Sequence, residues 1–126
     1  MTITNNGKTQ VRNWLASQVL SGSTSTVDSL TRIAVGSGTT AAVVTDTNLE
    51  NTIDIKAFNS APDTTITREV TFVGFWSSQQ INSNTISEVG LFTLSGGGTL
   101  FSRSVFDGFD KDNTIELEID SIVEVK

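Results

Sequence analysis

The clearest structural signal in the chain is residues 114–125, TIELEIDSIVEV. In the first half of this stretch, apolar side chains (Ile115, Leu117, Ile119) alternate with acidic ones (Glu116, Glu118, Asp120). Successive side chains of a β-strand point to opposite faces, so a period of two predicts a strand with one apolar and one acidic face. We therefore expect a strand here that packs its apolar face on a core and turns its acidic face to water.

The same alternation extends upstream and predicts a β module over residues 30–126. Further strands are expected at residues 30–35, 52–58, 65–75, 85–94 and 99–106, with turn-forming residues between them. Residues 45–51 look instead like one turn of helix capped by Thr45 or Asp46. Short strands at this spacing are typical of all-β folds, so we predict a mainly β protein, an antiparallel β-sandwich or a barrel-like fold.

Residues 7–20 have the spacing of a short N-terminal α-helix. Their apolar residues form one stripe, at Val11, Trp14, Leu15, Val19 and Leu20. Asn5 or Asn6 could cap this helix, which is short enough that it must pack on something to be stable. A polar loop at residues 21–29 then leads to the β module, and a chain of 126 residues suits a single domain.

The composition excludes several classes of function. The chain has no Cys and no His, which removes thiol nucleophiles, Ser-His-Asp relays, Cys/His zinc sites and the usual haem ligands. Its formal net charge is −6 and its basic residues are scattered singly, so we expect no nucleic-acid binding through phosphate neutralisation. No apolar run approaches the roughly 20 residues of a membrane span, and the N-terminus does not read as a signal peptide. We predict a soluble, non-enzymatic protein made inside the cell.

Three weak patterns point toward chemistry, and each has a simpler explanation. The Gly36-Ser37-Gly38 segment lacks the third Gly or the Lys of a phosphate-binding loop, so a tight turn explains it. Both a loose Ca²⁺ site and a solvated turn fit a cluster formed by Asp107, Asp110, Asp112, Asn113, Glu116 and Glu118. The pairs Glu116/Glu118 and Asp54/Glu69 could serve as glycosidase carboxylates, but two carboxylates alone are an unspecific signal. We therefore assign no catalytic, cofactor-binding or metal-binding residue.

The two tryptophans are the first candidates for contact with a partner. Trp14, with Leu15 beside it, could anchor a neighbouring protein because Trp is enriched at binding hot spots, or it could pack on its own sheet. Trp76 stands near Phe72, Phe75 and the amide-rich residues 77–84, which could form a glycan-binding surface because sugars stack on aromatic rings. The competing interpretation places Trp76 in the core or in a protein interface.

Glu88 interrupts an otherwise apolar strand, ISEVGLF at residues 86–92. If its carboxylate is buried it needs a partner, and Arg103 or Arg68 are the candidates; otherwise it faces water. Gly90 predicts a bulge or a close approach of another segment. With Trp14, Leu15 and Trp76, the residues Glu88 and Arg103 complete the set that we single out for contact with a partner.

From about residue 28 onward the chain resembles bacteriophage virion proteins of the tail-collar-fibre-like kind and related tail or head-fibre proteins. The segments that carry the resemblance are LTRIAVGSGTT (30–40), DTNLEN (46–51), VTF (70–72), ISEVGLF (86–92) and GGTLFSR (97–103), followed by Lys111 before the last strand. Each segment alone is weak, whereas their order along most of the chain is more specific. The sequence NNGK at residues 5–8, ahead of a short helix, is similar to the start of such proteins.

The resemblance implies a non-enzymatic structural subunit, made in the host cytoplasm and assembled into the virion. Its partners would be other virion proteins and further copies of itself, in a trimer or a ring. Collar-fibre proteins are usually longer and continue into a shaft and tip, so 126 residues favour a tail or collar adaptor, a vertex component or a capsid decoration protein. The alternative from the aromatic residues is a glycan-binding, receptor-recognising module.

Overall fold

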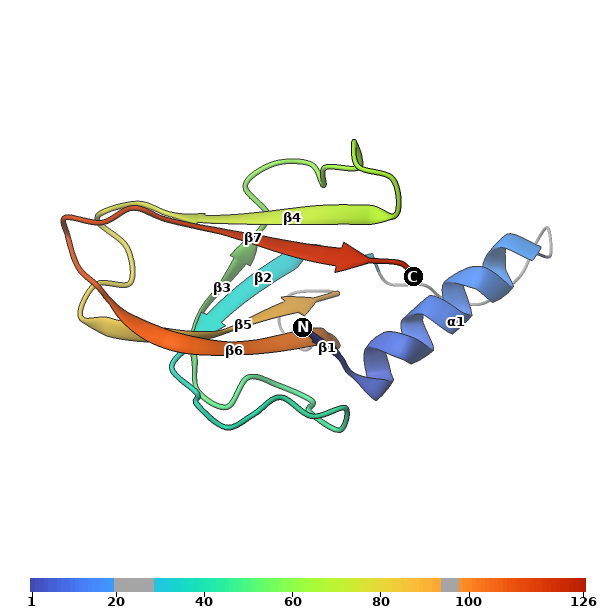
Figure 1. Ribbon diagram of the computed structural model, residues 1–126, viewed down its shortest axis with the longest axis horizontal. Coiled ribbons are helices and arrows are strands. Elements are labelled where there is room, and N and C mark those ends of the chain that lie inside the picture. Colours follow the sequence, from blue (N-terminus) through green and yellow to red (C-terminus); the bar gives the residue numbers. More distant parts are fainter. Residues whose placement is uncertain (20–28, 94–97) are drawn as a thin grey trace.

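Figure 1 shows the computed structural model of the chain, which describes residues 1–19, 29–93 and 98–126. The elements in chain order are β1 (Thr2–Ile3), α1 (Asn5–Val19), β2 (Arg32–Gly36), β3 (Thr52–Ala57), β4 (Glu69–Trp76), β5 (Asn84–Phe92), β6 (Leu100–Lys111) and β7 (Leu117–Glu124). Apart from Ser29, the predicted polar loop 21–29 lies outside the described residues, as does Leu20 at the end of the predicted helix. The description of α1 also leaves out the side chains of residues 14 and 16–19.

The strands form two antiparallel sheets. Five strands pair in the order β1-β6-β5-β2-β3, and β4 pairs with β7 in a second sheet. The two sheets face each other across an apolar core, and Figure 1 shows β4 and β7 lying along one side of the larger sheet. The predicted mainly β, antiparallel fold with one N-terminal helix is therefore confirmed, in its sandwich form and without closure into a barrel.

The core between the sheets follows the alternation of the sequence. In β7, Leu117 is buried whereas Glu118 and Asp120 are exposed, as the period of two predicts. Phe72 and Trp76 of β4 face the same core. The larger sheet contributes Ile33, Val35, Ile86, Val89, Leu91 and Phe101. Burying a side chain of this size contributes about 1.5–3 kcal/mol, so this layer is the main source of folding free energy.

The opposite face of the larger sheet is covered by the loop that joins β2 to β3, residues 37–51 (Figure 1). Leu49 of this loop packs with Ala34, Phe92 and Leu100 in a second apolar cluster. β5 is consequently buried on both faces. The prediction of a helical turn at residues 45–51 is wrong, because this segment is irregular and contains no helix. The carboxylate of Asp46 instead accepts a hydrogen bond from the N–H of Val43.

Several strand boundaries differ from the sequence-based prediction, and local features explain two of them. β4 begins at Glu69 because Arg68 has a φ of 70°, and the N–H of Glu69 closes a turn on the carbonyl of Ile66. β6 continues as far as Lys111 because its pairing with β5 shifts register between Ile86 and Glu88 and then resumes. A bulge of this kind bends a strand without ending it.

The N-terminus is tied to the edge of the larger sheet by a strand that the sequence analysis missed. β1 pairs with β6, with Thr2 opposite Arg103 and Ile3 opposite Ser102. Two residues give no period to detect, so only the tertiary pairing defines this strand.

Thr4 caps α1, in place of the predicted caps Asn5 and Asn6. Its buried hydroxyl accepts a hydrogen bond from the N–H of Gly7 at 3.0 Å and donates one to the carbonyl of Leu100. Asn5 and Asn6 are the first two residues of the helix, which therefore starts two residues before the predicted position. One side chain thus both begins the helix and fastens it to β6.

Beyond its start, α1 points away from the two sheets (Figure 1). Val11 is 44% exposed and Leu15 is 54% exposed. The helix is expected to pack on something, and at these two positions the chain's own sheets do not cover it. The contact with β6 lies at the first turn instead, where the backbone of Gly7 rests against that of Phe101.

Replacing Gly7 by alanine tests this first-turn contact. A Cβ at position 7 would overlap the carbonyl oxygen of Phe101, and backbone cannot move aside as a flexible side chain can. We expect Gly7→Ala to destabilise the protein by about 1–3 kcal/mol, although alanine is the better helix former. Thermal unfolding measures the loss, with the exposed Thr9→Ala as the matched change. A Gly7→Ala protein as stable as the wild type would refute the contact.

Candidate functional site

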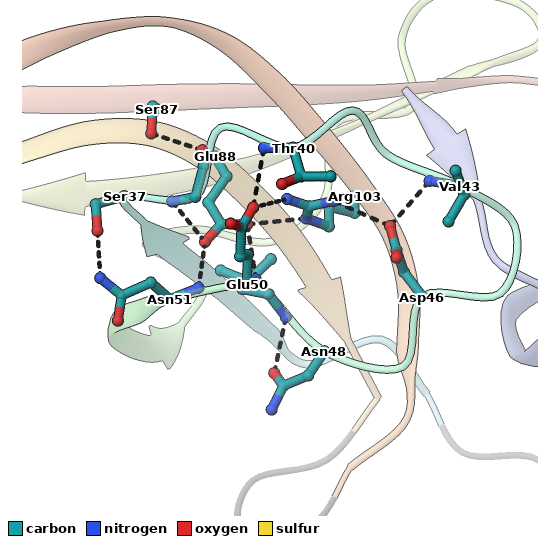
Figure 2. A network of polar contacts seen from close by, with 12 residues as sticks. Ser37, Thr40, Val43, Asp46, Asn48, Glu50, Asn51, Ser87, Glu88 and Arg103 are labelled. Carbon is teal, nitrogen blue, oxygen red and sulfur yellow. Dashed lines mark hydrogen bonds and ion pairs between the residues drawn. The ribbon is translucent and has the colours of Figure 1, made fainter.

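A cluster of charged side chains with a buried centre lies between the larger sheet and the 37–51 loop (Figure 2). Its centre is Arg103 of β6, whose side chain is 3% exposed. Its Nε donates to Oε2 of Glu88 at 2.8 Å and its Nη1 to Oδ2 of Asp46 at 3.0 Å. Its Nη2 lies 3.5 Å from Oε2 of Glu50, close enough for charge attraction although no hydrogen bond forms. One guanidinium is thus surrounded by three carboxylates.

The register of the sheet brings Glu88 and Arg103 together. Arg103 lies opposite Gly90 in the β5–β6 pair, and Glu88 lies opposite Gly36 in the β2–β5 pair. Residues directly opposite each other point to the same face of a sheet. Gly36 leaves the space that the Glu88 carboxylate occupies, because a Cβ there would collide with it. The close approach predicted at Gly90 is also present, since a Cβ there would lie 2.7 Å from Cδ2 of Leu49.

One guanidinium cannot satisfy the oxygens of three carboxylates, and backbone N–H groups of the loop donate further hydrogen bonds to them. Glu88 accepts from Gly38 at 3.0 Å, Glu50 at 3.0 Å and Asn51 at 2.8 Å, Asp46 accepts from Val43 at 2.9 Å, and Glu50 accepts from Thr40 at 2.9 Å. Loops of this length without regular structure are uncommon in compact domains. Here the carboxylates give the loop a fixed shape.

The Gly36-Ser37-Gly38 turn does bind an anion, and that anion is the carboxylate of the chain's own Glu88. The N–H of Gly38 points at Oε1 of Glu88, while the hydroxyl of Ser87 donates to the Gly38 carbonyl at 2.7 Å. A Cβ on Gly38 would lie 2.7 Å from the Glu88 carboxyl carbon. The turn therefore has its ligand within the chain, which agrees with its interpretation as a tight turn.

Hydrogen bonding lowers the pKa of each carboxyl group in the cluster. Burial raises the pKa of Glu88, but hydrogen bonds from the Asn51 N–H and from Arg103 outweigh it and hold the pKa below its ordinary value of 4.5. The Val43 N–H lowers the pKa of Asp46, and the Thr40 N–H lowers that of Glu50. For Arg103, burial acts to lower the pKa, but Glu88 and Asp46 raise it above its ordinary value. All four groups are therefore charged at neutral pH.

The sequence identified half of this cluster. Glu88 is fully buried and pairs with Arg103, whereas the other candidate, Arg68, is exposed. Glu88 and Arg103 are singled out for contact with a partner, and in this structure the chain itself encloses both side chains. Asp46 and Glu50 were missed because the DTNLEN segment was interpreted as a helical turn.

Trp76 cannot offer its ring to a sugar in this structure. Its side chain is fully buried, and its indole N–H donates to Oδ2 of Asp54 at 2.8 Å. Lys56 Nζ lies 5.3 Å from the ring centroid, within the range of a cation–π contact. The suggested carboxylate pair Asp54/Glu69 does not form, because Asp54 sits at the Trp76 end of β4 and Glu69 begins the strand at its other end. Of the two interpretations of Trp76, the core position is the observed one.

A polar hollow of about 510 Å³ lies between residues 82–85 and 110–113. Polar groups that line it bond to one another: buried Lys111 donates to Asn82 Oδ1 at 2.8 Å, and the hydroxyl of Thr85 donates to Oδ1 of Asp110 at 2.7 Å. No aromatic ring lines it. Across the part of the chain that the structure describes, no three carboxylates gather in a way that could hold a metal ion. The contacts in this hollow fit the interpretation of the acidic cluster as a solvated turn.

The structure describes the side chain of only one of the two contact candidates on α1. Leu15 is exposed and available to a partner. Trp14 lies on the same helix, and its side chain falls outside the described residues.

Comparison of the chain with protein-family models, with curated proteins and with solved structures finds no match. No helix within the described residues is long and apolar enough to cross a membrane.

Removing the guanidinium at the centre of the cluster should be costly. Arg103→Met keeps most of the aliphatic volume but leaves Glu88 buried without its cationic partner. We expect a loss of about 3–5 kcal/mol in the free energy of unfolding, measured by urea denaturation. Arg68→Met makes the same chemical change at an exposed arginine and should shift stability by less than about 0.5 kcal/mol. Equal losses in the two variants would contradict the role given to Arg103.

The acid limb of the stability curve should depend on Glu88. A carboxylate whose pKa is lower in the folded than in the unfolded state stabilises the protein above pH 4.5 and loses that contribution as pH falls through the folded value. Glu88→Gln should therefore be less stable than the wild type at neutral pH, with the difference shrinking below pH 4.5. Urea titrations across this range measure it, with the exposed Glu118→Gln as control. A difference that stays constant with pH would contradict the lowered pKa.

Proposed function

We propose that this chain is a non-enzymatic structural subunit of a bacteriophage particle, a tail, collar, adaptor or vertex component that acts through protein–protein contacts. The observation that carries the proposal is that segments far apart in the sequence meet at one place in the fold. Four of the segments that resemble virion proteins meet at the Arg103 cluster: GSG supplies Gly36 and Gly38, DTNLEN supplies Asp46 and Glu50, ISEVGLF supplies Glu88 and GGTLFSR supplies Arg103. Segments that are weak one by one thus belong to a single structural device.

The nature of that device also favours a structural role. Its charged groups bind one another and hold the 37–51 loop to the sheet, and Glu88 and Arg103 at its centre are buried. Such a cluster fixes a shape. Among the surfaces left for a partner is the exposed face of α1, where Leu15 and Val11 stand clear of the chain's own core.

The experiment is made on phage particles whose genome encodes this chain. Particles are purified by density banding, dissociated and analysed by quantitative mass spectrometry, and an antibody against the chain locates it on intact particles by electron microscopy. We expect the chain in the banded particles at a fixed ratio to the major capsid protein. Labelling at the tail or neck supports the adaptor role, and labelling spread over the capsid supports the decoration role instead. A chain abundant in infected cells and missing from the particles would refute the proposal.

A further inference from the structure

One face of α1 combines positive charge with exposed apolar side chains. Lys8, Val11, Arg12 and Leu15 follow the spacing i, i+3, i+4 and i+7, so they share one side of the helix, and all four are exposed. We call this side the α1 face. The helix carries these two basic residues and no acidic one, although the whole chain has fourteen acidic residues and eight basic ones. The helix is therefore positive and the remainder of the chain is strongly negative.

The complementary surface is the side of the β4–β7 sheet that points away from the core, which we call the outer face. In the β4–β7 register, Phe75 lies opposite Glu118, Val73 opposite Asp120, Thr71 opposite Ile122 and Glu69 opposite Glu124. Carboxylates thus border a strip of apolar side chains, of which Ile122 is 49% exposed. Glu69 and Glu124 face each other across the strands, an arrangement of like charges that is unfavourable unless a cation comes near.

Within the described part of the chain, neither surface forms an ion pair. The three ion pairs found in residues 1–19, 29–93 and 98–126 all belong to Arg103. The outer face is also long enough to take the α1 face along its length. The α1 face spans about 10 Å along the helix axis at 1.5 Å per residue. The outer face of β7 from Glu118 to Glu124 spans about 20 Å at roughly 3.3 Å per residue.

We propose that the α1 face of one copy docks on the outer face of the β4–β7 sheet of a second copy, so that subunits associate head to tail. A second copy is the partner because each chain carries both halves of the match, and because in this structure α1 points away from its own sheets with Val11, Leu15 and Ile122 all left exposed (Figure 1). Lys8 and Arg12 pair with carboxylates of the partner's outer face, while Leu15 and Val11 pack on its apolar strip. A heterologous contact of this kind closes into a ring or continues as a filament. The inference rests on the proposed structural role and names the surfaces that serve it.

Two reciprocal charge reversals test the contact. Lys8→Glu with Arg12→Glu makes the α1 face negative, and Glu118→Lys with Asp120→Lys makes the outer face positive. Sedimentation velocity of the full chain at low ionic strength reports the dissociation constant. We expect each double variant to raise it by at least about tenfold, and we expect wild-type association to weaken in about 1 M salt, where the screening length falls to about 3 Å.

The two variants change the net charge in opposite directions, which separates a specific contact from general repulsion. General repulsion weakens the association of the more negative helix variant and strengthens that of the less negative sheet variant. Docking predicts that both are weakened, and that an equal mixture associates again, because the negative α1 face of one variant meets the positive outer face of the other. Leu15→Ala should weaken association without changing the melting temperature, whereas Thr9→Ala on another side of the helix should leave association unchanged.

Several results would overturn the docking proposal. They are a wild-type chain that is monomeric at every soluble concentration, association that is insensitive to either reversal, and a mixture that stays dissociated. None of these bears on whether the chain is found in phage particles, so failure of the docking contact and failure of the virion role are distinguished by the two experiments.

Discussion

The structure depends on the burial of Arg103 against Glu88. An isolated charge in a protein interior is costly, and this pair is tolerated because each partner satisfies the other and the loop N–H groups satisfy the rest. The consequence reaches beyond the two residues. The 37–51 loop has neither helix nor strand to define it, and its course follows from the places where carboxylates accept its N–H groups. The loop in turn covers the second face of the larger sheet, so that residues 86–92 of β5 are buried.

The elements that the sequence reveals are those whose side chains alternate against a core. LEID at residues 117–120 and ISEVGLF at residues 86–92 both lie in strands whose apolar faces have a sheet to pack on, whereas residues 114–116 of the predicted last strand precede β7. β1 and the Thr4 cap could not be found in this way. Two residues carry no period, and the cap depends on the carbonyl of Leu100, which only the tertiary fold brings near.

Of the four charged residues in the cluster, the sequence indicates Glu88 and Arg103 but not Asp46 and Glu50. A glutamate in the middle of an apolar strand signals that it needs a partner, and the sequence offers Arg68 and Arg103 as candidates. Asp46 and Glu50 give no such signal, because a short polar segment of Asp, Thr, Asn and Glu looks the same in a capped helical turn and in a loop that folds around a guanidinium. The glycan interpretation of Trp76 failed because the amide-rich loop beside it suggested exposure, whereas Asp54 accepts the indole N–H inside the fold.

The distribution of charge connects the fold to its use. The ion pairs found among the described residues are all centred on Arg103 and fix the shape of the chain's own loop, whereas the basic residues of α1 and the carboxylates of the outer face form none there. In the proposed head-to-tail contact, these are the two surfaces that a neighbouring copy completes.

The most direct test of this account is native-state hydrogen exchange of the loop amides that donate to carboxylates, those of Gly38, Glu50 and Asn51. If the Arg103–Glu88 pair organises the loop, these amides are protected in the wild type and lose protection together in Arg103→Met, while amides of the β4–β7 pair stay protected. If they exchange at the rate of free loop amides in the wild type, the loop is not held by the cluster and the account is wrong.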